Sequence, residues 1–253
     1  MHPLLRQLAH RPWPLPTAPW IMRQSWRDLL FAHWPVPAAR LRPLVPAALS
    51  IQEFDGTSWV GLVPFRMADV MAHRWPAVPG LSAFPEMNLR LYVQAQDKPG
   101  VWFISLDAAN ALAVWGGRRF VHLPYFHAAI TARDDGTRIH YEAVRRRPPD
   151  LRVAFRAVFG PTSAVVPAAP GTLEHFLTER YCLYAQTPGG DLRRVQVHHA
   201  PWPLQAASAE IAENTVGDAQ GIPLSGPPAL LHFSRRIDVL TWAPEPVATA
   251  TSG

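Results

Sequence analysis

Proline is the feature of this 253-residue chain that most limits its fold, because 28 prolines are spread along the sequence. Proline lacks a backbone N–H, fixes φ at about −65° and interrupts both helix interiors and central strands. The chain is therefore divided into short segments. Most of these segments carry the residue types of strands, and fewer carry those of helices.

Strand-forming residues gather in five of these segments, which are rich in Val, Phe, Tyr and Trp, and several of which alternate in polarity. The five predicted strands are 58–65, 88–95, 101–108, 138–145 and 151–159. The sequence DDGT at 134–137 is typical of a hairpin turn. We expect 58–65, 88–95, 101–108 and 126–159 to share one curved antiparallel sheet. Six residues should be largely buried in it: Trp59, Val101, Phe103, Leu106, Val153 and Phe155.

Three segments favour helices. The segment 37–46 has proline near its first turn, and 111–120 is an apolar run that ends in two glycines and two arginines. The segment 172–184 has Thr172 as a candidate N-cap and an apolar stripe at helical spacing. Together with the strands, these helices predict a β-rich α+β fold.

Composition indicates one large domain, since hydrophobic residues make up 48% of the chain and are enough for a sizeable core. We expect an extended proline-rich arm over 1–20, a single domain over 21–245 and a flexible tail over 246–253. The lone cysteine excludes an intramolecular disulfide and favours a reducing cytoplasm. No signal peptide and no membrane-spanning segment is expected.

The basic charge of the chain comes almost entirely from arginine, because Lys98 is the only lysine and the net charge is +5. These arginines are dispersed along the chain, and such a bias reflects genome composition better than nucleic-acid binding. We therefore expect no nucleic-acid partner. Lys98 lies in QDKPG, a turn-like sequence in which its side chain should be exposed.

Several blocks together resemble the YqjF-like family of uncharacterised bacterial proteins. They are LRPLVPAALSIQEFDGTSWVGLVPF (41–65), FPEMNLRLYV (84–93), GVWFISLDAANALAVWGGRRFVHLPYFHA (100–128), LEHFLTERYCLY (173–184) and HHAPWPL (198–204). They span most of the chain in a consistent order. The resemblance implies no activity, since none is established for that family.

The segments LRPLVPAALSI and ALAVWGGRRFVHLPYF also resemble, more distantly, acetoacetate decarboxylase. The fold that this resemblance implies is a cone-shaped antiparallel β-barrel around an apolar pocket, flanked by short helices. In that enzyme a lysine just after a proline forms a Schiff base with the keto acid. Here Pro124 matches the proline and Tyr125 stands where the lysine would be. A phenol cannot form an imine, so decarboxylation by that route is not expected.

The resemblance marks two candidate catalytic residues, Tyr125 and Glu86. Glu86 falls near the pocket glutamate of the decarboxylase, where a carboxylate acts as a general base or orients a substrate. The structural alternative for Glu86 is a salt bridge with Arg90 or another arginine. The alternative for Tyr125 is packing in an aromatic turn at the end of the barrel.

Four further residues are candidates for substrate binding. Arg118 and Arg119 carry guanidinium groups that suit a carboxylate, although basic residues near a helix end also complement its dipole. Because they are adjacent, at most one of them is expected to face a pocket. His122 and His127 are a candidate proton donor and acceptor.

Other motifs point away from specialised chemistry. The histidine spacing and the single cysteine fit no zinc site, and there is no nucleotide-binding or serine-hydrolase motif, so we expect neither metal nor cofactor. Asp107 and Asn110 are placed to cap the helix that starts at 111. The basic run RRRPPD at 145–150 is typical of a solvated loop.

Two functions remain open. One is an enzyme whose barrel pocket takes a small organic acid or keto compound, with Tyr125 and Glu86 in acid–base roles. The other is a non-catalytic small-molecule binder, a sensor or carrier, that kept the pocket and lost the lysine. The sequence is compatible with a homo-oligomer in either case.

Overall fold

The computed structural model describes residues 2–76, 82–146, 152–224 and 226–248. Its strands are β1 Met22–Pro35, β2 Ser50–Ile51, β3 Glu53–Phe54, β4 Thr57–Ala72, β5 Phe84–Ala95, β6 Lys98–Ala108, β7 Tyr125–Asp134, β8 Ile139–Arg145, β9 Ala154–Pro161, β10 Cys182–Gln186, β11 Leu192–His198, β12 Gln205–Asn214, β13 Leu230–Thr241 and β14 Glu245–Pro246. Its helices are η1 Pro3–Arg6, α1 Ala38–Leu41, η2 Arg42–Leu44, α2 Ala111–Gly116, η3 Gly117–Val121, α3 Leu173–Thr178 and η4 Asp218–Gln220.

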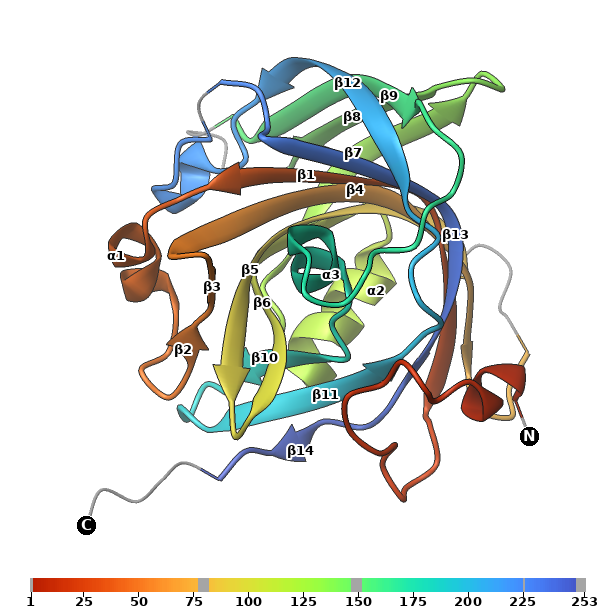
Figure 1. The fold of residues 1–253 in the computed structure, drawn as a ribbon, viewed down its shortest axis with the longest axis vertical. Coiled ribbons are helices and arrows are strands. Elements are labelled where there is room, and N and C mark those ends of the chain that lie inside the picture. The colour runs from red at the N-terminus through yellow and green to blue at the C-terminus, as the bar shows by residue number, and fades with distance from the viewer. Residues whose placement is uncertain (1, 77–81, 147–151, 225, 249–253) are drawn as a thin grey trace.

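Strand pairing within these described residues closes two rings, and Figure 1 shows how strongly the strands curve. The first ring runs through β1, β4, β5, β6, β7, β8, β9, β12 and β13. The second ring runs through β1, β4, β5, β6, β10, β11 and β13. We call the strands common to both, β13, β1, β4, β5 and β6, the shared wall.

The sequence of the shared wall reflects burial on both of its faces. Alternate residues of a strand point to opposite sides of the sheet. In β5, Met87 and Leu89 pack into the core of the first ring, whereas Glu86, Asn88, Arg90 and Tyr92 face the second. On β5, the apolar side chains are therefore buried in the first ring, whereas the polar side chains lie in the second ring, together with the candidate site.

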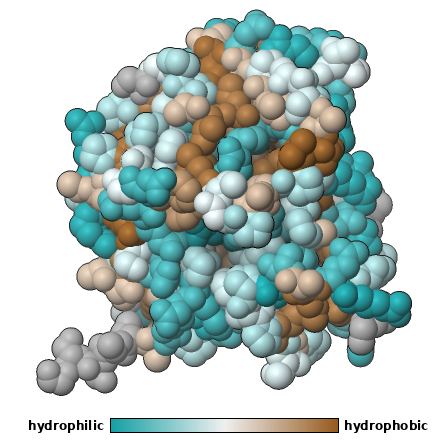
Figure 2. Space-filling view, in the orientation of Figure 1, coloured by the Kyte–Doolittle hydropathy of each residue, from teal (hydrophilic) through white to brown (hydrophobic). Residues whose placement is uncertain are grey.

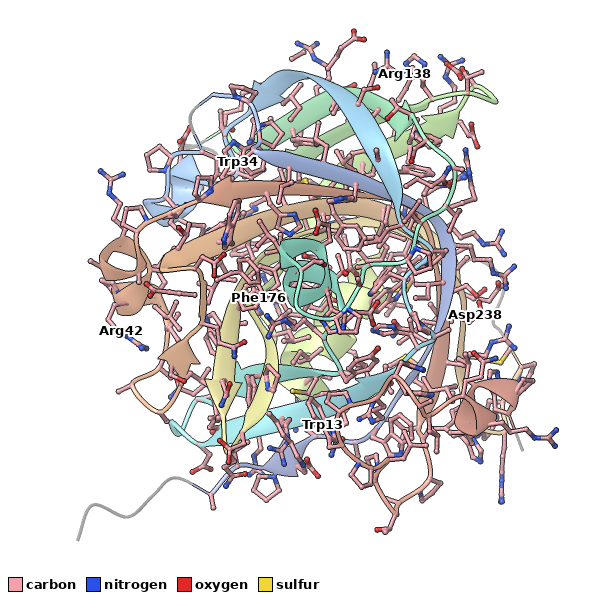
Figure 3. The ribbon with its side chains drawn as sticks, in the orientation of Figure 1. Trp13, Trp34, Arg42, Arg138, Phe176 and Asp238 are labelled. Carbon is pink, nitrogen blue, oxygen red and sulfur yellow. The ribbon has the colours of Figure 1, made fainter. Side chains whose placement is uncertain are left out.

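The second ring is filled by side chains and by α3. Leu177 of α3 is fully buried and packs in one cluster with Trp59, Tyr92 and Val101. Figure 3 shows Phe176 of the same helix within the outline of this ring, and side chains cover the opening in the space-filling view of Figure 2. The interior of this ring is therefore built from both apolar and polar groups.

The predicted strands at 58–65, 88–95, 101–108 and 138–145 are confirmed within β4, β5, β6 and β8. The DDGT hairpin is confirmed between β7 and β8, with Gly136 at φ 98°. The helices predicted at 37–46 and 111–120 are confirmed as α1 with η2 and as α2 with η3. The β-rich α+β fold class is likewise confirmed, as a closed ring of strands with short helices.

The helix predicted over 172–184 is too long. Thr172 does cap α3 through the backbone N–H of His175, but the helix ends at Thr178. The residues from Cys182 to Gln186 form β10 instead, paired with both β11 and β6. Sheet pairing from distant strands overrides a helical apolar stripe, because local propensity is weak beside tertiary packing.

Three other expectations need correction. The strand predicted at 151–159 is β9, which begins at Ala154. Phe103 is only partly buried, whereas the other five residues predicted to be buried are so. The sheet is not wholly antiparallel, because β6 pairs in parallel with β7 and with β10.

Both ends of the described chain are held against the sheet. The arm predicted to be extended contains η1, and Arg11 is buried with its guanidinium on the Val197 carbonyl and the Gln196 side chain. The predicted tail begins inside β14, and Val247 is buried with its N–H donating to Leu192. Residues 249–253 of that tail lie outside the described residues. No helix in the described ranges is long and apolar enough to cross a membrane.

Candidate functional site

The stretch that joins α2 to β7 makes a sharp corner. Asn110 caps α2 by accepting from the N–H groups of Leu112 and Ala113, as predicted. The helix continues as the wider turn η3 and stops at His122, which is left-handed at φ 58°. Three residues later β7 begins at Tyr125 and joins β6 in parallel, opposite Leu106. The chain therefore turns around Pro124, and this turn brings Tyr125 to the second ring.

Tyr125 meets Glu86 at this corner. Its hydroxyl donates to Oε2 of Glu86 across 3.1 Å. Glu86 is 3% exposed at the start of β5, where it pairs with Phe65 of β4. The two residues that the resemblance marked as catalytic candidates therefore lie side by side, and within the described residues Glu86 makes no salt bridge with Arg90 or any other arginine.

Burial sets the protonation of this pair. Burial chiefly, and the charge of Asp107 as well, raise the pKa of Glu86 against the lowering effect of the hydrogen bond from Tyr125, and the net value is about 8. Burial and the neighbouring Glu86 together hold the pKa of Tyr125 well above its usual range. At neutral pH the carboxyl group is therefore mostly protonated and the phenol is neutral, which makes both groups proton donors.

A buried ion pair lies beside them. Arg145 of β8 binds Asp107 of β6 through two hydrogen bonds of 2.7 and 2.9 Å, and its guanidinium lies 3.8 Å from the centre of the Phe126 ring. Two expectations are therefore wrong: Asp107 does not cap the helix that starts at 111, and Arg145 does not lie in a solvated loop. Both side chains are 3% exposed or less. Residues 147–150 of the basic run lie outside the described residues.

Tyr141 links the side of the sheet that carries the Asp107–Arg145 ion pair to the Glu86–Tyr125 pair. Its hydroxyl donates to the backbone carbonyl of Glu86 at 2.8 Å. Tyr141 is buried and lies four residues before Arg145 on β8, so both side chains point to the same face of the sheet. The backbone of Glu86 is thereby fixed from β8 while its side chain meets β7.

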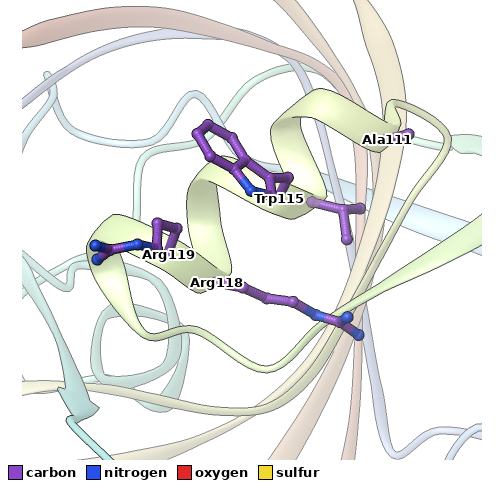
Figure 4. Close-up of a pocket in the computed structure, with 5 residues that line it drawn as sticks. Ala111, Trp115, Arg118 and Arg119 are labelled. Carbon is purple, nitrogen blue, oxygen red and sulfur yellow. The ribbon is translucent and has the colours of Figure 1, made fainter.

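The two adjacent arginines lie at the surface and point in different directions (Figure 4). Arg118 donates through Nε to the carbonyl of Tyr125 at 2.6 Å, so it holds the backbone of the candidate residue. Arg119 lies over the ring of Phe120 instead. Both line an open pocket of about 390 Å³ on the outer side of α2, with Ala111, Val114 and Trp115. Glu86 and Tyr125 are not among the residues that line it.

The remaining predicted residues stand apart from the pair. His122 occupies the left-handed corner, and His127 lies in β7, where its carbonyl accepts from the N–H of Arg146. Neither imidazole bonds to Glu86 or Tyr125 within the described residues. No group of three or more metal-binding side chains occurs in the described part of the chain.

Lys98 is not exposed in the way its sequence suggests. The turn of the β5–β6 hairpin is formed by Gln96 and Asp97, and Lys98 is the first residue of β6. Its side chain is half-buried, with Nζ 5.8 Å from the centre of the Trp13 ring. The N-terminal arm, which supplies Trp13, covers it.

Known proteins with this fold were identified by sequence and by structure. The uncharacterised protein YqjF of Bacillus subtilis is 46% identical over 228 residues, which cover 90% of this chain and 93% of that protein. The enduracididine biosynthesis enzyme MppR, in complex with pyruvate, is similar in structure with a TM-score of 0.62 and 12% identity, covering 95% of each chain. An acetoacetate decarboxylase from Legionella pneumophila gives a TM-score of 0.59 and 14% identity, over 98% of this chain and 96% of that one.

The structural matches show the fold alone, because their identities are low. They establish that the fold is acetoacetate decarboxylase-like, as the sequence resemblance implied. The family is established by sequence. The model of a family described as an uncharacterised conserved protein matches residues 23–238, which is most of the chain. The chain therefore belongs to this family, DUF2071, and is also related to YqjF over 90% of its length.

Proposed function

We propose that this protein binds a small organic acid or keto compound at Glu86 and Tyr125. The observation that carries the proposal is the hydrogen bond between a buried carboxyl group and a phenol at the point where β7 begins. Two proton donors side by side in a buried setting are suited to a ligand oxygen that is rich in electrons. A ketone carbonyl and a carboxylate both present such an oxygen.

The structural neighbours support the same class of ligand. One of them holds pyruvate and another is a decarboxylase of acetoacetate, and both compounds are keto acids. Tyr125 takes the position that the resemblance gives to the Schiff-base lysine. We propose that the ligand is held here by hydrogen bonds, without an imine, because neither Tyr125 nor Glu86 has an amine.

The protonation of the pair defines what chemistry it can offer. A protonated Glu86 can give its proton to a ligand carbonyl and take it back, while Tyr125 remains a neutral donor. This would promote enolisation of a keto acid: Glu86 gives its proton to the carbonyl oxygen, and the resulting carboxylate accepts a proton from the carbon next to the carbonyl, so that Glu86 is protonated again. The alternative is a binding protein in which the same two groups only hold the ligand.

Ligand binding is tested by thermal unfolding with pyruvate, acetoacetate and acetate, since a ligand that binds only the native state raises its stability. We expect at least one compound to raise the melting temperature of the wild type. Tyr125→Phe should bind it several-fold more weakly with little loss of stability, because one hydrogen bond is worth roughly 1 kcal/mol. An unchanged affinity in Tyr125→Phe and Glu86→Gln would contradict the site.

Catalysis and simple binding are separated by hydrogen exchange. NMR in D₂O measures whether the protein accelerates deuterium uptake at the methyl group of pyruvate, and whether Glu86→Gln removes that acceleration. Binding without exchange would favour the sensor or carrier. Borohydride reduction followed by mass spectrometry should leave no adduct, and an adduct at Lys98 would overturn the proposal of an imine-free ligand.

A further inference from the structure

Two arginines are buried in the second ring without an acidic partner. Arg90 of β5 is 8% exposed, and Arg180, just after α3, is 7% exposed. Neither forms an ion pair with a carboxylate in the described part of the chain, in contrast to Arg145 and Arg194, which are equally buried and are paired with Asp107 and Glu245. Arginine is rarely buried unless its charge is paired, because an unpaired buried charge is costly.

The contacts of these two arginines are with neutral groups. Arg180 donates through Nε to the carbonyl of Phe176 at 2.6 Å and through Nη1 to the side chain of Gln52. Among the described residues, the one hydrogen bond of the Arg90 side chain is long, with Nη2 3.4 Å from the carbonyl of Leu177, and its guanidinium also lies over the ring of Phe31. Charge-assisted hydrogen bonds of arginine are normally about 2.7–2.9 Å long. The guanidinium of Arg90 is thus poorly satisfied.

The two guanidinium groups lie over the same aromatic ring. Both guanidinium groups pack on the ring of Tyr92, with their central carbons 5.8 Å and 5.1 Å from its centre. Burial lowers the pKa of Arg180 to about 10, and the charge of Arg90 lowers it as well. Like charges in a buried setting repel, so an anion that contacts both guanidinium groups would stabilise this arrangement.

Unpaired polar atoms collect on the same side of the shared wall. Nε of Arg90 has no hydrogen-bond partner among the described residues. Further buried atoms that face the second ring are also unpaired within that part of the chain, among them Nδ1 of His33, Nε1 of Trp59, Oδ1 of Asn88, Nδ1 of His232 and Oγ of Ser234. Buried polar groups are nearly always satisfied, so a cluster of exceptions points to a bound species.

We propose that Arg90 and Arg180 bind a small oxyanion, a carboxylate or a phosphate, inside the second ring. The anion would accept from Nε of Arg90 and from the guanidinium of Arg180, and it would replace the long contact to Leu177. This site is distinct from the Glu86–Tyr125 pair, because Glu86 and Arg90 are four residues apart on one strand, about 13 Å. The oxyanion site does not rest on the proposed function.

Binding is measured by calorimetry and by the NMR signals of the arginine Nε–H groups. The probes are malonate and inorganic phosphate, each compared with sodium chloride at equal ionic strength. We expect one probe or both to shift the Nε–H signal of Arg90 with saturation, and chloride not to do so. A response to phosphate alone or to malonate alone identifies which oxyanion the site takes. No saturable shift with either probe would overturn the proposal.

Matched substitutions of buried arginines provide the second test. Arg90→Met and Arg180→Met should each weaken binding at least tenfold, and should stabilise the anion-free protein or leave its stability unchanged, because an unpaired buried charge is removed. Arg194→Met is the control. It should destabilise the protein by leaving Glu245 unpaired, and it should keep the anion response.

The Tyr125→Phe variant separates the two sites. It should keep full affinity for phosphate, whereas Arg90→Met should keep the response of the Glu86–Tyr125 pair. Equal anion binding by the wild type and by Arg90→Met would refute the oxyanion site. If Arg90→Met does not fold, the Arg90 Nε–H signal in the wild type still decides the matter.

Discussion

Gly117 lies directly against the ring of Tyr125, and a β-carbon added to Gly117 would meet that ring at 2.5 Å. Real β-carbons essentially never approach another atom so closely. The glycine therefore lets η3 pack flat on the aromatic ring. It is the residue that allows Tyr125 to reach Glu86 from a corner this tight.

Replacing Gly117 with alanine should displace Tyr125 from Glu86. We expect a loss of roughly 1–3 kcal/mol in the free energy of unfolding, typical of overpacking, and a weaker Tyr125–Glu86 bond. Urea denaturation measures the first effect. Gly116→Ala is the control, since a β-carbon there meets nothing within 4 Å and alanine favours helix. Equal stabilities for the two variants would show that the corner is not tight.

Stability should fall as pH rises through the range in which Glu86 titrates. Burial raises its pKa from an ordinary 4.5 to about 8, so the folded protein holds this proton more tightly than the unfolded chain does. The contribution is fully present below about pH 4.5 and is lost towards pH 8, at up to about 1.4 kcal/mol per pH unit.

The Glu86→Gln variant isolates that contribution. Buried histidines such as His33 and His198, whose pKa values are lowered by burial, titrate with the opposite sign, because their charging at low pH opposes folding. Subtracting the free energy of unfolding of the variant from that of the wild type removes the contribution of these histidines. Urea denaturation at pH 5, 6.5 and 8 measures this difference, and a difference that stays constant with pH would mean that Glu86 has an ordinary pKa.

Breaking the Asp107–Arg145 pair should be strongly destabilising. Asp107→Asn removes the charge that two hydrogen bonds satisfy and leaves a buried guanidinium, at a cost of about 3–5 kcal/mol. The double variant Asp107→Leu with Arg145→Met should recover much of that loss, because no charge is left buried. Guanidinium denaturation compares the three proteins, and a single-variant cost below about 1 kcal/mol would argue that water reaches the pair.

Cys182 should be unreactive in the native protein. Burial raises the pKa of its thiol to about 11, and the thiolate is the reactive form. An aromatic disulfide reagent at pH 8 should modify it only after the protein is unfolded in urea. Rapid modification of the folded protein would show that β10 opens readily.

The sequence predicted the fold class and marked Tyr125 and Glu86 as candidates, but it did not predict the surroundings of their contact. Both residues were marked by the resemblance to acetoacetate decarboxylase, which rests on short local segments of sequence. The Asp107–Arg145 pair had no such signal, since it joins β6 to β8. From the sequence alone, Asp107 was interpreted as a cap at the start of a helix, and Arg145 as part of a basic run.

The arginines also show that local sequence signals do not predict which side chains meet in the fold. Arg118 and Arg119 attracted attention because they are adjacent to Tyr125 in sequence, yet they lie at the surface. Arg90 lies inside because alternation along β5 carries it to the same side as Glu86. Strand β1 was missed for a related reason: its residues 29–34 are buried on both faces, so they show no alternation.

The shared wall also means that the two rings cannot be divided. Its strands come from both ends of the chain, from β1 near the N-terminus to β13 near the C-terminus. A fragment that kept one ring would have to keep the wall, and would then expose to water the face that the other ring had covered. The protein should accordingly unfold in one step, and insertions should be tolerated in its loops far better than the removal of either ring.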